Sequence, residues 1–211
     1  MTEPRKHVEQ LKVAGRSESQ RVLAALKKHG LLLQTDARLP NVCALVTGAP
    51  VRGSWWAHPR SHDIFRVSCG LAEYPDVLVI KLVSSKVTYV HRALWPYVVT
   101  IGRARAAWQL ESLSRAALEL LEEVDGTPVQ TDRGFAKPAS ELEKMLLVSS
   151  EQVHTAAGSH ARRLESWDQW AQRKGLAQSK VKVDEAIDAL EQVMDSLNRQ
   201  FHARGRLPWH T

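Results

Sequence analysis

The residues best suited to chemistry lie in one short segment of the chain, from Arg52 to Asp63. This segment holds two tryptophans, two histidines, two arginines and one aspartate. Indole rings stack on bases, guanidinium groups bind phosphates through paired hydrogen bonds, and imidazole rings exchange protons near neutral pH. The segment is therefore the candidate functional site, and its candidate binding residues are Arg52, Trp55, Trp56 and Arg60.

The adjacent tryptophans, Trp55 and Trp56, have an alternative role in the core of the protein. Large aromatic side chains contribute much of the packing energy wherever they are buried. Neighbouring residues in an extended segment point in opposite directions, however, so burying both rings in a small domain is difficult. We therefore expect at least one of the two rings to be partly exposed.

His58 and His62 are four residues apart, the spacing at which two side chains share one face of a helix. Two such histidines can hold a metal ion, but Asp63 does not join that face and no third ligand has a suitable spacing. We therefore expect no metal and no other cofactor. If the chain is an enzyme, His58 and His62 would act as acid and base beside Asp63. This lone carboxylate favours binding over catalysis.

Periodicity and capping residues predict the elements that position this segment. The third predicted helix carries Ile64, Phe65 and Val67 inward. The expected elements are, in order, a helix from Ser17 to Gly30 followed by the apolar run 31–33, a short helix over residues 40–46, a third helix opened by Pro59, and a hairpin whose strands, 77–83 and 86–91, flank Ser84 and Ser85.

Three helices followed by a hairpin resemble the winged-helix class, and the resemblance covers about residues 17–92. It implies that the tip of the hairpin, the wing, reaches a groove or a backbone phosphate. The loop over residues 48–60 is longer than the usual helix–turn–helix connection, and there the chain departs from the class. The further candidate contacts are Arg66 on the third helix, Lys86 at the tip of the wing, and Lys81, His91 and Arg92 along or just beyond its strands. Lys86 has a simpler alternative role as a solvated turn residue.

The pattern after the hairpin is helical. One apolar stripe runs to Val124 and predicts a long helix, which a loop over residues 126–138 follows. Two further stripes, over residues 142–167 and 183–201, predict an antiparallel helical pair with its turn near Gly175. The second stripe repeats strictly by four and three, as in a heptad seam. Such a seam either packs within the chain or forms a homodimer through residues 183–201.

These elements predict a mainly α fold with one β-hairpin. A winged-helix-like N-terminal domain would be followed by a long helix and an antiparallel helical pair. The chain would then divide into a flexible basic arm (residues 1–16), a winged-helix-like basic domain with its following helix (17–124), and a helical scaffold or oligomerisation region (126–211).

The charge is distributed unevenly along the chain. Residues 1–110 contain 16 Lys and Arg against 7 Asp and Glu, a net of +9, whereas residues 111–211 contain 13 against 16, a net of −3. A basic surface gains free energy on a polyanion by releasing counterions. We therefore expect the first half to bind nucleic acid, DNA rather than RNA, and a chain that ends near Val124 to keep this binding. The alternatives are an enzyme acting on nucleic acid, such as a glycosylase or nuclease, and a helical protein–protein adaptor.

Several classes of protein are excluded by the sequence. No GxxxxGK phosphate loop, GxGxxG turn or GxSxG elbow occurs, so nucleotide hydrolysis, dinucleotide redox chemistry and this type of serine hydrolysis are not expected. The aliphatic runs are too short to span a bilayer, and no secretory signal is visible. Two cysteines do not build a disulfide scaffold. We therefore expect a cytoplasmic protein without membrane contact.

Overall fold

The computed structural model describes residues 17–131, 135–154, 160–176 and 179–210. It is mostly helical and contains two small antiparallel sheets of three strands each. None of the helices in these ranges is long and apolar enough to cross a membrane. The predicted basic arm over residues 1–16 lies outside the described residues.

The first part of the chain alternates helices with short strands. Its opening helix covers residues 17–29, buries Val22 and Leu26 one turn apart, and is followed by Gly30 at φ 74°. The next elements are β1 (Leu31–Leu33), α2 (Val42–Thr47), the 3-10 helix η1 (Trp55–Ala57), α3 (Ser61–Ala72), β2 (Val77–Lys81), the 3-10 turn η2 (Val83–Ser85) and β3 (Val87–His91).

The first sheet has the strand order β1-β3-β2, with both pairs antiparallel. The predicted hairpin is present as β2 and β3, but β1 was not predicted from the sequence. Leu32 lies opposite Tyr89 and packs with α2 and α3, whereas Leu31 and Leu33 enter a second core cluster on the other face. Alternate side chains of a strand point to opposite faces, so this short leucine run joins two layers.

The long helix predicted up to Val124 is wrong, because the chain breaks it twice. After the 3-10 turn η3 (Arg92–Leu94), the chain forms α4 (Trp95–Ala104), α5 (Ala107–Leu110) and α6 (Arg115–Gly126). Arg105 adopts a left-handed conformation at φ 47°, and the Ser114 hydroxyl accepts a hydrogen bond from the Ala117 N–H to start α6. The predicted apolar stripe runs from Ala106 to Val124 and spans α5 and α6, so its spacing alone did not reveal the break between these two helices.

The antiparallel helical pair predicted for residues 126–211 is also wrong. Of the two predicted helices, only the second is present over its predicted length, as α9 (Val183–Phe201). Residues predicted to form the other helix divide among α7 (Ala136–Lys144), β5 (Ser149–His154), β6 (His160–Glu165) and α8 (Trp167–Arg173), with β4 (Val129–Thr131) preceding them. Leu142 and Leu164 are buried as predicted, but they come from a helix and a strand that pack together. The predicted stripe member Ala157 lies outside the described residues.

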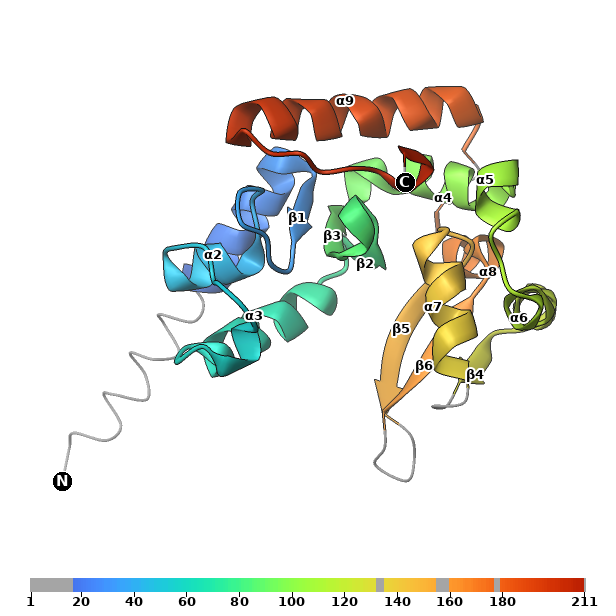
Figure 1. Cartoon of the computed structure of the whole chain (residues 1–211), viewed down its shortest axis with the longest axis horizontal. Helices are drawn as coiled ribbons and strands as arrows, with labels where there is room; N and C mark the ends of the chain where they lie inside the picture. Colours follow the sequence, from blue (N-terminus) through green and yellow to red (C-terminus); the bar gives the residue numbers. More distant parts are fainter. Residues whose placement is uncertain (1–16, 132–134, 155–159, 177–178, 211) are drawn as a thin grey trace.

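The second sheet repeats the strand order of the first. Its order is β4-β6-β5, so in both sheets the third strand in the sequence lies between the first and the second. The two sheets lie side by side below α9 in Figure 1, each with its own helices.

One hydrophobic core crosses the boundary predicted near residue 125. The seam residues Leu190, Met194 and Leu197 of α9 are buried in the same cluster as Leu31 and Leu78 of the first sheet. The seam therefore packs within the chain. A homodimer through residues 183–201 stays a prediction, and it would need contacts other than these buried side chains.

Candidate nucleic-acid interface

The segment from Arg52 to Asp63 connects α2 to α3. Trp55, Trp56 and Ala57 form the single-turn helix η1, and α3 begins at Ser61, two residues after the proline predicted to open it. The segment is hydrogen-bonded locally: the N–H of Ala57 donates to the Ser54 carbonyl oxygen, and the N–H of His58 to that of Trp55. The candidate residues are therefore held on a short structured turn.

Three aromatic rings meet where η1 lies against α3. Trp55 and Trp56 are stacked, with ring centroids 3.9 Å apart and an interplanar angle of 26°. The ring of Phe65 lies 5.7 Å from that of Trp56. Trp55 is half-buried against the core, but Trp56 is 61% exposed and Phe65 is 48% exposed. We call these three side chains the aromatic patch.

The exposure of one tryptophan was predicted, but for the wrong reason. In the tight turn of η1 the neighbouring rings stack on each other, whereas an extended segment would have directed them apart. The inward placement predicted for Phe65 is wrong. The buried face of α3 consists of Ile64, Val67, Ser68 and Leu71. The spacing of Ile64, Val67 and Leu71 was the signal that Phe65 lies off this face.

Arg60 and Arg66 are engaged by carboxylates. Arg60 forms ion pairs with Glu18 from the opening helix and with Asp63, and its guanidinium also donates to the Val46 carbonyl oxygen. Arg66 forms ion pairs with Asp63 at 2.9 Å and with Glu18 at 3.6 Å. Burial raises the pKa of Asp63, but the hydrogen bonds and charges of Arg60 and Arg66 outweigh it and hold that pKa below its usual value. The four side chains are together electrically neutral.

The two histidines do not share a helix face. His58 lies before α3 in extended conformation, and its Nδ1 accepts a hydrogen bond from the Arg60 N–H. His62 is exposed in the first turn of α3. The Asp63 carboxylate bonds to the two arginines, and no bond from it to either histidine is found in the part of the chain that the structure describes. Within those residues, no group of three or more His, Cys, Asp or Glu is placed to hold a metal ion.

A shallow cleft adjoins the aromatic patch. Its volume is about 270 Å³. Arg52 lies on its rim, is exposed, and has no ion-pair or hydrogen-bond partner among the described side chains. The cleft is lined by Thr47, Ala49, Pro50, Val51, Arg52, Ser54, Ala57, His58 and Pro59.

The predicted contacts on the hairpin lie apart from this patch, and most have partners. Lys86 pairs with Asp36 at 2.6 Å, and Arg92 pairs with Asp76 and lies over the ring of Trp95. His91 is half-buried and accepts a hydrogen bond from the Ala93 N–H. Contact of these side chains with nucleic acid stays a prediction.

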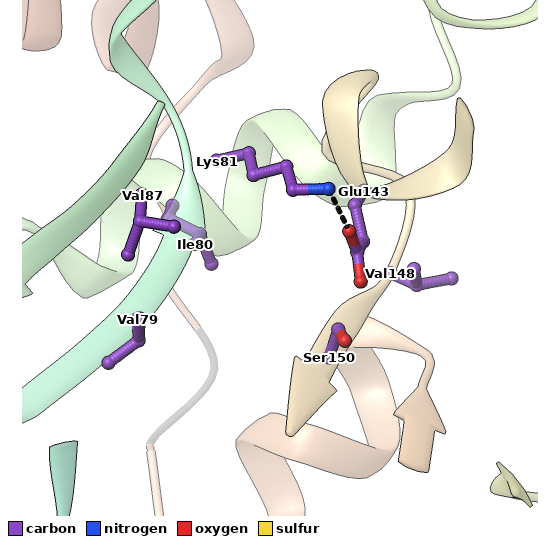
Figure 2. A pocket seen from close by; sticks show the side chains of 7 residues that line it. All are labelled: Val79, Ile80, Lys81, Val87, Glu143, Val148 and Ser150. Carbon is purple, nitrogen blue, oxygen red and sulfur yellow. Dashed lines mark ion pairs between the residues drawn. The ribbon is translucent and has the colours of Figure 1, made fainter. Parts of the chain in front are cut away.

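Lys81 is directed into a second cleft between the two sheets. Figure 2 shows Lys81 from β2 and Glu143 from α7 pointing toward each other, with their charged atoms 2.6 Å apart. This cleft has a volume of about 120 Å³ and is lined mainly by aliphatic side chains such as Ile80 and Val148. The Glu143 side chain is only 8% exposed and also pairs with Arg162. Lys81 thus links the two sheets, and a phosphate contact would require this pair to open.

Comparison with known proteins gives no relative from which to transfer a role. The sequence matches no protein-family model, and neither the curated proteins nor the solved structures include a significant match.

Proposed function

We propose that this protein binds nucleic acid, DNA rather than RNA, through a winged-helix-like domain over residues 17–91. The order of elements supports the proposal: a helix, β1, α2, α3 and then the hairpin of β2 and β3, with β1 paired to β3. In this arrangement α3 takes the position of the third helix and η2 that of the wing tip. The net charge of +9 in residues 1–110 supports a polyanionic partner. Both cysteines are free, which suits a cytoplasmic location as part of the same proposal.

The observation that carries the proposal is the exposed Trp56 ring on its stacked support. An indole held in place by Trp55 loses little conformational entropy when a base stacks on its open face. Exposed aromatic rings next to unpaired arginines are the typical platform for bases and phosphates. Arg52 supplies the phosphate contact, since its guanidinium has no competing carboxylate among the described residues.

The test is a binding assay with variants of two exposed aromatic residues. Trp56→Ala should weaken binding to single-stranded or mismatched DNA by about 1–3 kcal/mol, roughly tenfold to hundredfold in Kd. The control is Tyr74→Ala, since Tyr74 is 42% exposed just beyond the opposite end of α3. Fluorescence anisotropy with single-stranded, duplex, mismatched and abasic DNA, and with RNA, measures the Kd. Unchanged affinity in a folded Trp56→Ala protein would remove the stacking role, and release of a base or a cut strand would favour the enzyme instead.

A protein–protein adaptor is the second candidate, because of the neutral surroundings of the aromatic patch. Arg60 and Arg66 next to Phe65 are balanced by Glu18 and Asp63, and exposed apolar patches also mark protein interfaces. Salt separates the candidates: contacts with phosphates weaken steeply as salt rises, whereas burial of apolar side chains against a protein does not.

A further inference from the structure

The C-terminal segment after α9, residues 202–210, is anchored on the turn of the β2–β3 hairpin. We call it the C-terminal strap. His202 reverses the chain at φ 48°, and Asn198 then holds Gly205 through two hydrogen bonds, one in each direction. The N–H of Arg206 donates to the Ser84 hydroxyl, and the N–H of Ser84 donates to the Arg206 carbonyl oxygen. In Figure 1 the strap runs back beneath α9 toward the C-terminus.

Beyond the hydrogen bonds between Ser84 and Arg206, two side chains of the strap pack against the rest of the protein. Leu207 is 1% exposed, and the indole N–H of Trp209 donates to the Glu191 carboxylate at 2.8 Å. Gly205 packs closely here, because a Cβ at this position would lie 2.8 Å from the terminal methyl of Met194 and 2.9 Å from a methyl of Leu39. The strap is therefore a fixed part of the surface around the hairpin turn.

Anchoring the strap gathers basic side chains from three parts of the chain. Arg204 and Arg206 are exposed, with no side-chain partner among the described residues. Arg38 donates to the His202 carbonyl oxygen, and Lys86 follows the turn that bonds to Arg206. We call these four side chains the strap surface.

Among the residues that the structure describes, Asp36 is the one carboxylate that forms an ion pair with a cation of the strap surface, Lys86. Burial raises the pKa of Asp36, but hydrogen bonds from Lys86 and from the N–H groups of Arg38 and Leu39 outweigh this and hold that pKa below its usual value. Asp36 therefore stays ionised and offsets one charge, which leaves the strap surface at +3.

We propose that the strap surface binds the sugar–phosphate backbone of the same nucleic acid, with Arg204 and Arg206 as its main contacts. The inference rests on the proposed function and adds residues from the half of the chain whose net charge is negative. Arginine suits this role, because its guanidinium stays charged and binds phosphate oxygens in pairs. An anchored backbone lowers the entropy lost when these side chains become ordered on the ligand.

The test compares two double variants that each remove two positive charges. For duplex DNA, Arg204→Gln with Arg206→Gln should make the negative slope of log K against log salt shallower by about two. The same variant should raise the Kd about tenfold or more at low salt. The control is Lys174→Gln with Lys180→Gln, two exposed lysines without ion-pair partners among the described residues, which should leave the slope close to that of the natural chain. Melting curves check that both variants are folded.

The outcomes separate this inference from the proposed function. If the natural chain binds DNA with a steep salt slope and the strap variant keeps that slope, the strap surface is not an interface and the proposed function stands. If the natural chain binds no nucleic acid at any salt, both fail. If polyglutamate displaces the DNA at equal charge concentration, the strap surface serves an acidic protein partner and the inference is overturned.

Discussion

The arginine residues of the candidate interface differ in whether a carboxylate pairs with their guanidinium groups. Arg52 is exposed and unpaired among the described residues, whereas Arg60 and Arg66 share the carboxylates of Glu18 and Asp63. A phosphate approaching α3 would compete with these carboxylates and gain less than it gains at Arg52. The sequence showed which residue types gather here, but Glu18 lies 42 positions before Arg60, so their pairing could not be read from local spacing.

The first prediction concerns the charge balance around Asp63. Asp63→Asn removes one of the two carboxylates that hold Arg60 and Arg66, so more positive charge becomes available to phosphates. We expect tighter binding to duplex DNA and a salt slope that steepens by up to about one. Anisotropy titrations at several salt concentrations measure both quantities. Weaker binding by a folded Asp63→Asn protein would mean that the arginines need Asp63 to be positioned.

The second prediction is the pH dependence that follows from the lowered pKa of Asp63. A carboxyl whose pKa is lower in the folded than in the unfolded chain stabilises the fold above its unfolded pKa, about 3.9, and this stabilisation is lost as pH falls through the folded pKa. The difference in free energy of unfolding between the natural chain and Asp63→Asn should therefore be constant above about pH 5 and shrink below about pH 4. Urea unfolding at each pH measures it, and a difference that grows on acidification would refute this reading.

At the scale of elements, apolar periodicity predicted where side chains are buried better than it predicted which element carries them. The hairpin and α9 were recognised because β-branched runs and a strict heptad pattern are strong signals. β1 is only three residues long, and β5 is mostly polar. Their pairing depends on partners distant in the sequence, Tyr89 for Leu32 and Leu164 for Ser150, which no local pattern contains.

The third prediction tests the packing of α4 against α8. A Cβ on Gly102 would lie 2.1 Å from the Trp167 indole nitrogen, and that ring is buried and donates to the Leu146 carbonyl oxygen. Gly102→Ala should therefore destabilise the protein by about 1–3 kcal/mol. The control is Gly70→Ala in α3, where a Cβ meets no atom within 4 Å and should add stability of about 0.5–1 kcal/mol. Thermal melting that shifts in the same direction for both would contradict this account.

At the scale of the whole molecule, the basic and acidic halves of the chain contribute side chains to the same hydrophobic core cluster. The sequence showed the charge asymmetry correctly, but it did not show that Leu190 and Met194 complete the cluster around Leu31 and Leu78. Nor did it show that the strap carries basic residues back to the hairpin turn. Both depend on contacts between residues more than one hundred positions apart, which periodicity does not encode.

The fourth prediction concerns the folding of a chain that ends before α9; the binding expected of a chain ending near Val124 stays a prediction. Without α9, the cluster containing Leu31 and Leu190 would lose one of its sides and expose apolar surface. A chain ending at Lys182 should lose cooperative thermal unfolding and bind the dye ANS, as loosely packed states do. Cooperative unfolding near the melting temperature of the full chain would show instead that residues 17–182 fold independently of α9.

The affinity of the full chain for duplex DNA, measured across a series of salt concentrations, tests most directly whether this protein binds nucleic acid. Nucleic-acid binding through Arg52, Arg204 and Arg206 predicts a linear fall of log K with log salt, with a slope of about −3 or steeper, at roughly −0.9 for each phosphate neutralised. A flat dependence, or no binding even at low salt, would contradict the account and leave the aromatic patch as a surface for a protein partner.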